Sequence, residues 1–250
     1  VQGRRPCSVK RVRRLRLGVI GVHTYVFGRF PDTSSPDRCG TLVNVTSVDI
    51  ETPRGPARAH VEHAESPVAA LVLGHGAGGG VGAPDLKAAQ AAALGAGLSV
   101  ALVEQPYRVA GRRSPAPAAQ LDAAWLAVCA QLPFSGVPLV VGGRSSGARV
   151  ACRTAAGTGA VAVLCLAFPL HPPGRPEKSR LAELDGVPVP VLVVQGERDP
   201  FGMPPAGPDR SIVVVPGNHS LRSTGAVRDA VAGWLACVWS RCAPTRHPRP

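Results

Sequence analysis

Apolar and polar positions along this chain mark out two kinds of element in regular alternation. Continuous apolar runs of strand length occupy residues 69–74, 99–103 and 139–142, which is typical of strands buried on both faces of a sheet. Further runs of this kind lie at 160–168, 189–196 and 211–215, and helices are predicted over 84–96, 117–132, 146–157 and 226–239. Strands that alternate with helices build βαβ units. The pattern therefore predicts the α/β class, with a mostly parallel central sheet flanked by helices.

Two segments depart from this alternation. Residues Val43–Thr52 alternate apolar and polar side chains, residues 53–56 form a Pro- and Gly-containing turn, and Ala57–Glu62 lead the chain back. This pattern predicts an antiparallel hairpin at a sheet edge. Residues 169–188, between two predicted strands, are rich in Pro and Gly and too short for a large helical cap. We therefore expect an open site with a minimal lid.

Length and charge divide the chain into three parts. At 250 residues, a single large domain over residues 41–240 is the expected organisation. The net charge is +12, but nine of the 28 Lys and Arg residues, and only two of the 16 acidic ones, fall within residues 1–40. We expect 1–40 to be a basic, disordered extension and 241–250 a basic tail. A cationic tail can bind polyanions without sequence preference, whereas the nearly neutral body predicts no specific nucleic-acid partner.

The distribution of apolar residues and cysteines bears on location. Residues 13–27 loosely imitate a signal peptide, but His23 and Thr24 interrupt the apolar part and no convincing cleavage site follows. No apolar run approaches the ~18 residues of a transmembrane helix, so no membrane association is expected. The seven cysteines form neither a metal-ligand spacing nor a disulfide framework, which fits a reducing compartment. We expect a cytoplasmic protein.

The strongest chemical signal is Gly143-Arg144-Ser145-Ser146-Gly147, which follows the apolar run at 138–142 and leads directly into a predicted helix. Gly-x-Ser-x-Gly between a strand and a helix is the sequence form of a nucleophile elbow. The five residues alone could be a chance glycine-serine turn, but the strand before and the helix after favour the elbow. Only Ser145 stands at the central position of Gly-x-Ser-x-Gly, so Ser146 is excluded as the nucleophile.

A serine nucleophile needs a histidine base, and the base needs a carboxylate to orient it. In hydrolases with an elbow of this kind, the acid and then the base follow the serine along the chain, each just after a strand. Asp199 follows the apolar run 191–196, and His219 follows the run 212–215. The sequence therefore predicts Ser145, Asp199 and His219 as the catalytic residues, with Glu197 as an alternative acid.

The glycine-rich segment Gly74–Gly80 follows another predicted strand. Its backbone can approach a substrate carbonyl closely, so we expect the oxyanion hole to combine the N–H groups of Ala77 and Ser146. A phosphate-binding loop is the alternative, with Glu104 as the ribose-binding acid, but the segment lacks the Gly-Lys-Ser/Thr ending of a P-loop.

Residues 104–108 are expected to form a loop next to the glycine-rich segment. Tyr107 and Arg108 are candidates for substrate binding, because an Arg at this position could pair with a substrate carboxylate. The alternative is an exposed basic loop with no role in the site.

Several of these segments together resemble one group of proteins. They are Gly74–Gly79, Glu104–Gly111, Gly142–Ser145, His171–Gly174 and Gly196–Gly202. The chain resembles the α/β-hydrolase superfamily over about residues 43–240. Within it, the chain is similar to small bacterial hydrolases related to the hydrolase-like domain of a scaffold subunit of the NSL histone-acetylation complex and to its testis-expressed relative. The dienelactone hydrolases are a more distantly related group.

The resemblance implies a Ser145–Asp199–His219 triad, although Ser146-Gly147-Ala148 stands where the group usually has Met-Gly-Gly. We expect a serine hydrolase that cleaves a small ester, thioester or related acyl substrate, with that small molecule as its partner. The chemistry calls for no metal or organic cofactor. A catalytically silent hydrolase-like module that binds or scaffolds is the alternative.

Overall fold

The computed structural model describes residues 22–24 and 45–242. The strands are β1 (Val22–Thr24), β2 (Val45–Ile50), β3 (Ala57–Glu62), β4 (Ala69–Gly74), β5 (Leu98–Glu104), β6 (Leu139–Arg144), β7 (Ala162–Leu166), β8 (Val191–Gly196) and β9 (Arg210–Val215). The helices are α1 (Pro84–Gly95), α2 (Pro106–Val109), α3 (Ala118–Gln131), α4 (Ser146–Thr158), α5 (Leu181–Asp185) and α6 (Thr224–Cys242).

Over the described residues the strands form one sheet, in the order β1-β2-β3-β5-β4-β6-β7-β8-β9. The strands from β5 through β9 in this order pair in parallel, whereas β1, β2 and β3 are antiparallel to their neighbours. The predicted fold class, a mostly parallel sheet flanked by helices, is confirmed. Because Gly74 of β4 lies opposite Gly143 of β6, the loops that follow these two strands meet at the carboxyl edge of the sheet.

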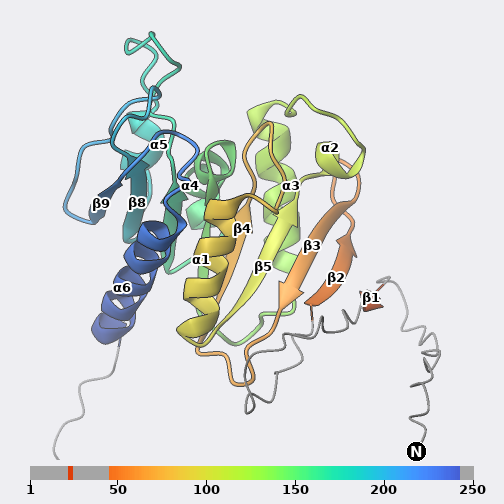
Figure 1. The fold of residues 1–250 in the computed structure, drawn as a ribbon. Helices are drawn as coiled ribbons and strands as arrows, with labels where there is room; N and C mark the ends of the chain where they lie inside the picture. The colour runs from red at the N-terminus through yellow and green to blue at the C-terminus, as the bar shows by residue number, and fades with distance from the viewer. Residues whose placement is uncertain (1–21, 25–44, 243–250) are drawn as a thin grey trace, which may run out of the picture.

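Helices cover both faces of the sheet (Figure 1). On one face α1 and α6 bury a core of Leu, Val and Ala that includes Leu71, Leu86 and Leu235. On the other face α3 and α4 pack around the buried Trp125. Strand β4 is buried along its whole length, as its continuous apolar sequence predicts.

Two parts of the sequence prediction differ from the structure. Residues 104–108 were expected to be a loop, but α2 begins at Pro106, whose fixed φ suits the first helical position while Gln105 remains extended. The predicted hairpin is β2–β3, yet its outer side is paired with β1, which comes from the predicted N-terminal extension. The rest of that extension and the tail from residue 243 lie outside the described residues.

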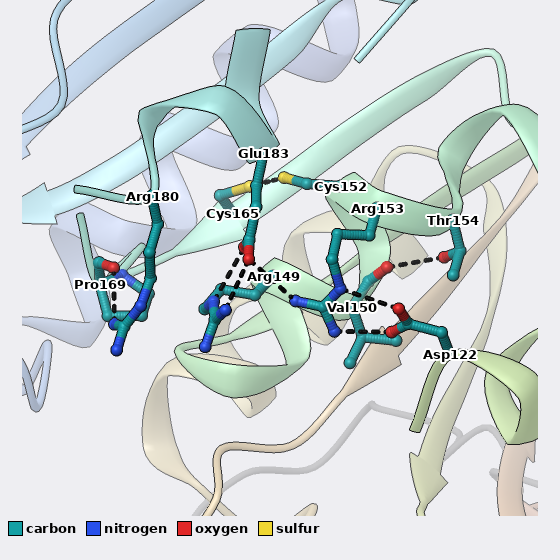
Figure 2. A network of polar contacts seen from close by, with 10 residues as sticks. All are labelled: Asp122, Arg149, Val150, Cys152, Arg153, Thr154, Cys165, Pro169, Arg180 and Glu183. Carbon is teal, nitrogen blue, oxygen red and sulfur yellow. Dashed lines mark hydrogen bonds and ion pairs between the residues drawn. The ribbon is translucent and has the colours of Figure 1, made fainter. Parts of the chain in front are cut away.

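The segment between β7 and β8 contains only the short helix α5. Ion pairs join α5 to α4 and α4 to α3 (Figure 2). Glu183 of α5 pairs with Arg149 and Arg153 of α4, and Arg153 also pairs with Asp122 of α3. Arg180 donates a hydrogen bond to the Pro169 carbonyl, 3.0 Å away. These contacts hold the segment against α4 and leave no large cap over the carboxyl edge of the sheet.

Candidate active site

Ser145 occupies a strained turn between β6 and α4. Its φ of 53° and ψ of −108° lie in a region that residues with a side chain rarely adopt. Its backbone N–H donates to the Leu166 carbonyl at 2.9 Å, which ties the turn to β7. A Cβ at Gly143 would lie 2.5 Å from the Gly74 carbonyl oxygen, and a Cβ at Gly147 would also strike the Gly74 backbone. The glycines that define the motif are therefore required by the close approach of β4.

The three residues predicted to act together form one chain of hydrogen bonds. Ser145 Oγ lies 2.9 Å from His219 Nε2, and His219 Nδ1 lies 2.8 Å from Asp199 Oδ2. Asp199 is almost fully buried, with 1 % of its side chain exposed, whereas His219 remains 17 % exposed. The alternative acid, Glu197, is 49 % exposed and pairs with Arg198.

Two residues that the sequence analysis missed support this chain. Gln195, the fifth residue of β8, donates from Nε2 to Asp199 Oδ2 at 2.9 Å. The backbone N–H of Phe201 donates to Asp199 Oδ1 at 2.9 Å, and its ring packs against the imidazole of His219 with centroids 4.1 Å apart. The Asp199 carboxylate therefore has a fixed orientation, and the Phe201 ring packs beside the His219 imidazole.

The glycine-rich segment after β4 is held in place by residues around α2. The backbone N–H of Gln105 donates to His75 Nε2 at 3.1 Å, so Nδ1 carries the proton and donates to the Gly76 carbonyl at 2.8 Å. Burial lowers the pKa of His75, which keeps the ring neutral. Tyr107 Oη donates to the Ala77 carbonyl at 3.0 Å, and its ring meets that of His75 edge to face.

The predicted oxyanion donors belong to two segments next to Ser145, the start of α4 and the glycine-rich segment. Ser146 is the first residue of α4, where backbone N–H groups have no partner within the helix. Gly76 crosses next to the nucleophile, since a Cβ on Gly76 would lie 3.6 Å from Ser145 Cβ. Ala77 follows Gly76 directly, so its backbone continues the segment that passes next to the Ser145 side chain.

The two candidates for substrate binding have different surroundings. Tyr107 is buried, and its hydroxyl is already bonded to the glycine-rich segment. Arg108 is half-buried and donates from Nη1 to the Arg112 carbonyl at 3.4 Å. The structure therefore joins Tyr107 to the predicted oxyanion loop, whereas Arg108 bonds from α2 to the turn that follows it.

The alternative interpretation of the glycine-rich segment required Glu104 to bind a ribose. In the structure Glu104 Oε2 accepts a hydrogen bond from His60 Nε2 of β3 at 3.1 Å, and this bond lowers the pKa of Glu104. The segment faces the Ser145 turn instead, which disfavours a dinucleotide site.

Fold and site together define the class of protein, an α/β hydrolase with a serine at the elbow. The model of the α/β hydrolase domain family matches residues 67–223, and the chain belongs to that family. A search of curated proteins found no match to the sequence.

Several solved structures share the fold. Est1E from Butyrivibrio proteoclasticus is 16 % identical, with a TM-score of 0.63 over 78 % of this chain and 99 % of its own. An α/β serine hydrolase without lid from Xanthomonas campestris is 22 % identical, with a TM-score of 0.57 over 75 % of this chain and 94 % of its own. Dienelactone hydrolase from Anabaena variabilis is 17 % identical, with a TM-score of 0.58 over 78 % of this chain and 96 % of its own.

Proposed function

We propose that this chain is a serine hydrolase that cleaves a small ester, thioester or related acyl compound. The observation that carries the proposal is the unbroken chain of hydrogen bonds from Ser145 Oγ through His219 to Asp199, with links of 2.9 Å and 2.8 Å. Separations of this length allow a proton to pass between the groups. Membership of the α/β hydrolase family supports the same conclusion.

In the proposed mechanism, Ser145 Oγ attacks the substrate carbonyl carbon while His219 Nε2 takes the hydroxyl proton. The Asp199 carboxylate holds the imidazole by its Nδ1–H and stabilises the imidazolium that forms. The N–H groups of Ala77 and Ser146 bind the tetrahedral oxyanion. His219 then protonates the leaving group, and water, activated by the same imidazole, hydrolyses the acyl-enzyme. These steps proceed without a metal or an organic cofactor.

The short connection between β7 and β8 supports a small substrate. The segment between β7 and β8 contains only the short helix α5, and a fold relative from Xanthomonas campestris is described as a serine hydrolase without lid. We further propose that the activity belongs to one domain over residues 41–240, and that this domain is related to the small bacterial hydrolases that resemble the hydrolase-like domain of the NSL-complex scaffold subunit.

The proposed location is the cytoplasm. The cysteines Cys129, Cys152 and Cys165 are free thiols, as expected in a reducing compartment. No helix within residues 45–242 has the length and apolar character needed to cross a membrane. The proposal includes neither a membrane nor a specific nucleic acid as partner.

The test is reaction with a fluorophosphonate probe together with hydrolysis of short-chain p-nitrophenyl esters. The wild type should be labelled and should turn over, and Ser145→Ala should lose both. Ser211→Ala, which removes an exposed hydroxyl on β9, is the matched control and should behave as the wild type. Labelling of Ser145→Ala at the wild-type rate would refute the assignment of the nucleophile. A folded wild type that neither reacts nor turns over would favour the silent binding module.

A further inference from the structure

The side chain of Arg144, the residue before the proposed nucleophile, reaches three other segments of the chain. Its Nε lies 2.8 Å from Asp85 Oδ2 at the start of α1. Its Nη2 donates to the His219 backbone carbonyl at 3.0 Å. Its Nη1 passes over Gly76, where an added Cβ would come within 2.9 Å of that nitrogen. One guanidinium therefore lies against the loop that carries His219, the glycine-rich segment, and helix α1, which follows the glycine-rich segment.

The partner of Arg144 is a carboxylate with no contact to solvent. Asp85 is 0 % exposed, and its Oδ1 accepts the backbone N–H of Leu86 at 3.0 Å. Burial raises the pKa of Asp85, while the charge of Arg144 opposes that effect. A buried ion pair often stabilises a fold no more than apolar side chains of the same volume would. Stability alone therefore does not account for a charged pair at this place, next to the site.

The geometry points to Arg144 as a positioning residue of the proposed hydrolase, acting on His219 and on the oxyanion loop. This inference rests on the proposed function. His219 lies in a loop between β9 and α6, outside the regular hydrogen bonding of the sheet. Arg144 is bonded covalently to Ser145 and by a hydrogen bond to the His219 carbonyl. It therefore links nucleophile and base directly, while the charge of Asp85 holds the guanidinium next to the start of α1.

The planar fork of arginine is necessary for this role. Nε, Nη1 and Nη2 are fixed relative to one another within one plane, and each lies next to a different segment. A lysine could neutralise Asp85 with its single ammonium group, but it could not also hold the His219 carbonyl and cover Gly76. We therefore expect Arg144→Lys to fold like the wild type and to react slowly.

The decisive variant is the double substitution Arg144→Met with Asp85→Asn, because it leaves no buried charge without a partner. Its kcat on a p-nitrophenyl ester should fall by about tenfold to a hundredfold, the loss that small misplacements of catalytic groups cause. Its KM should stay within about twofold of the wild type, because neither residue is placed against the substrate. Arg144→Lys should show the same split between kcat and KM.

The control breaks another ion pair, whose arginine has an exposure similar to that of Arg144 and which lies away from the reacting groups. Arg153 and Asp122 join α4 to α3 (Figure 2), with about a fifth of each side chain exposed. Arg153→Met with Asp122→Asn should lower the melting temperature and leave kcat unchanged.

The outcomes separate this inference from the function on which it rests. A wild type without labelling or turnover refutes the hydrolase itself, and the inference with it. An active wild type, with kcat unchanged in both the Lys variant and the double variant, overturns the positioning role while the hydrolase stands. If the double variant does not fold, the kcat of Arg144→Lys alone tests the positioning role, because the lysine still neutralises Asp85.

Discussion

Gln195 Nε2 donates a hydrogen bond to Asp199 Oδ2, the same carboxylate oxygen that accepts from His219 Nδ1. Gln195 is fully buried, and its Nε2 also lies 3.1 Å from the Phe168 carbonyl and 2.9 Å from that of Gly202. The amide therefore fixes the position of the acid relative to the ends of β7 and β8. The orientation of the base depends on this amide as well as on the carboxylate.

Replacement of Gln195 by Met should reduce both activity and stability. The variant keeps the volume but leaves the Phe168 and Gly202 carbonyls without this donor, at a cost of about 1–3 kcal/mol in the free energy of unfolding. Release of Asp199 should lower kcat by up to about a hundredfold. Urea unfolding and ester hydrolysis measure the two effects. Gln131→Met, which removes an exposed amide of α3, is the control, and equal kcat in both variants would contradict the role of Gln195.

Asp199→Asn should keep the fold and lose most of the activity. The amide occupies the same volume, but it removes the charge that stabilises the imidazolium and favours the wrong tautomer of His219. Loss of a triad carboxylate in this way lowers kcat by about 10⁴-fold. Steady-state kinetics on a p-nitrophenyl ester measures the effect, and circular dichroism checks the fold. Less than a tenfold loss would show that Asp199 does not orient the base.

Much of the fold and the three hydrogen-bonded residues could be predicted from the sequence for a simple physical reason. The segment 57–62 alternates small or apolar with polar residues, as in a strand with one buried face, and the apolar run 69–74 is typical of a strand buried on both faces; β3 and β4 have these bounds in the structure. Parallel strands bring their carboxyl ends to one edge, so residues directly after β6, β8 and β9 had to lie near one another. The order of serine, acid and base along the chain then assigned a role to each of the three residues.

The supporting residues could not be predicted in the same way, because their partners come from distant segments. Gln195 is a polar residue within an otherwise apolar buried strand, and this was a signal that the sequence offered. Arg144 stands at a position that the elbow motif leaves free, and its pairing with Asp85 depends on how α1 follows the glycine-rich segment. Tyr107 was only a candidate for substrate binding, because the bond from its hydroxyl to the Ala77 carbonyl is visible only in the folded chain.

Tyr107→Phe separates a role in holding the oxyanion loop from a role in substrate binding. Burial raises the pKa of Tyr107, so its hydroxyl stays protonated and donates to Ala77. Loss of this bond, worth about 0.5–1.5 kcal/mol, should lower kcat by about two- to tenfold while KM stays constant. A rise in KM without a change in kcat would instead identify Tyr107 as a substrate-binding residue. The measurement is a full substrate titration of the variant and the wild type.

Gly147→Ala should destabilise the protein, because there is no space for a methyl group. The new Cβ would lie 2.6 Å from the Gly74 carbonyl carbon and 2.8 Å from the His75 carbonyl oxygen, and neither backbone atom can move independently. We expect the free energy of unfolding to fall by about 1–3 kcal/mol or more. Gly233→Ala on the exposed side of α6 meets no atom within 4 Å and should raise this free energy by up to about 1 kcal/mol. Urea unfolding should therefore give opposite signs for the two substitutions, and a neutral Gly147→Ala would contradict the close packing of β4 against the elbow.

The buried imidazole of His75 should make stability depend on pH. Burial lowers its pKa below the ordinary value of 6.5, so the unfolded chain takes up a proton at a pH where the folded chain does not. The contribution of His75 to stability is therefore complete above about pH 6.5 and decreases as the pH falls towards the lower pKa of the folded state. In His75→Asn the side chain does not titrate, so the free energy of unfolding should fall less steeply from pH 7.5 to pH 5.5 than in the wild type. Urea unfolding at several pH values measures both slopes, and equal slopes would show that the ring is not held neutral beneath the oxyanion loop.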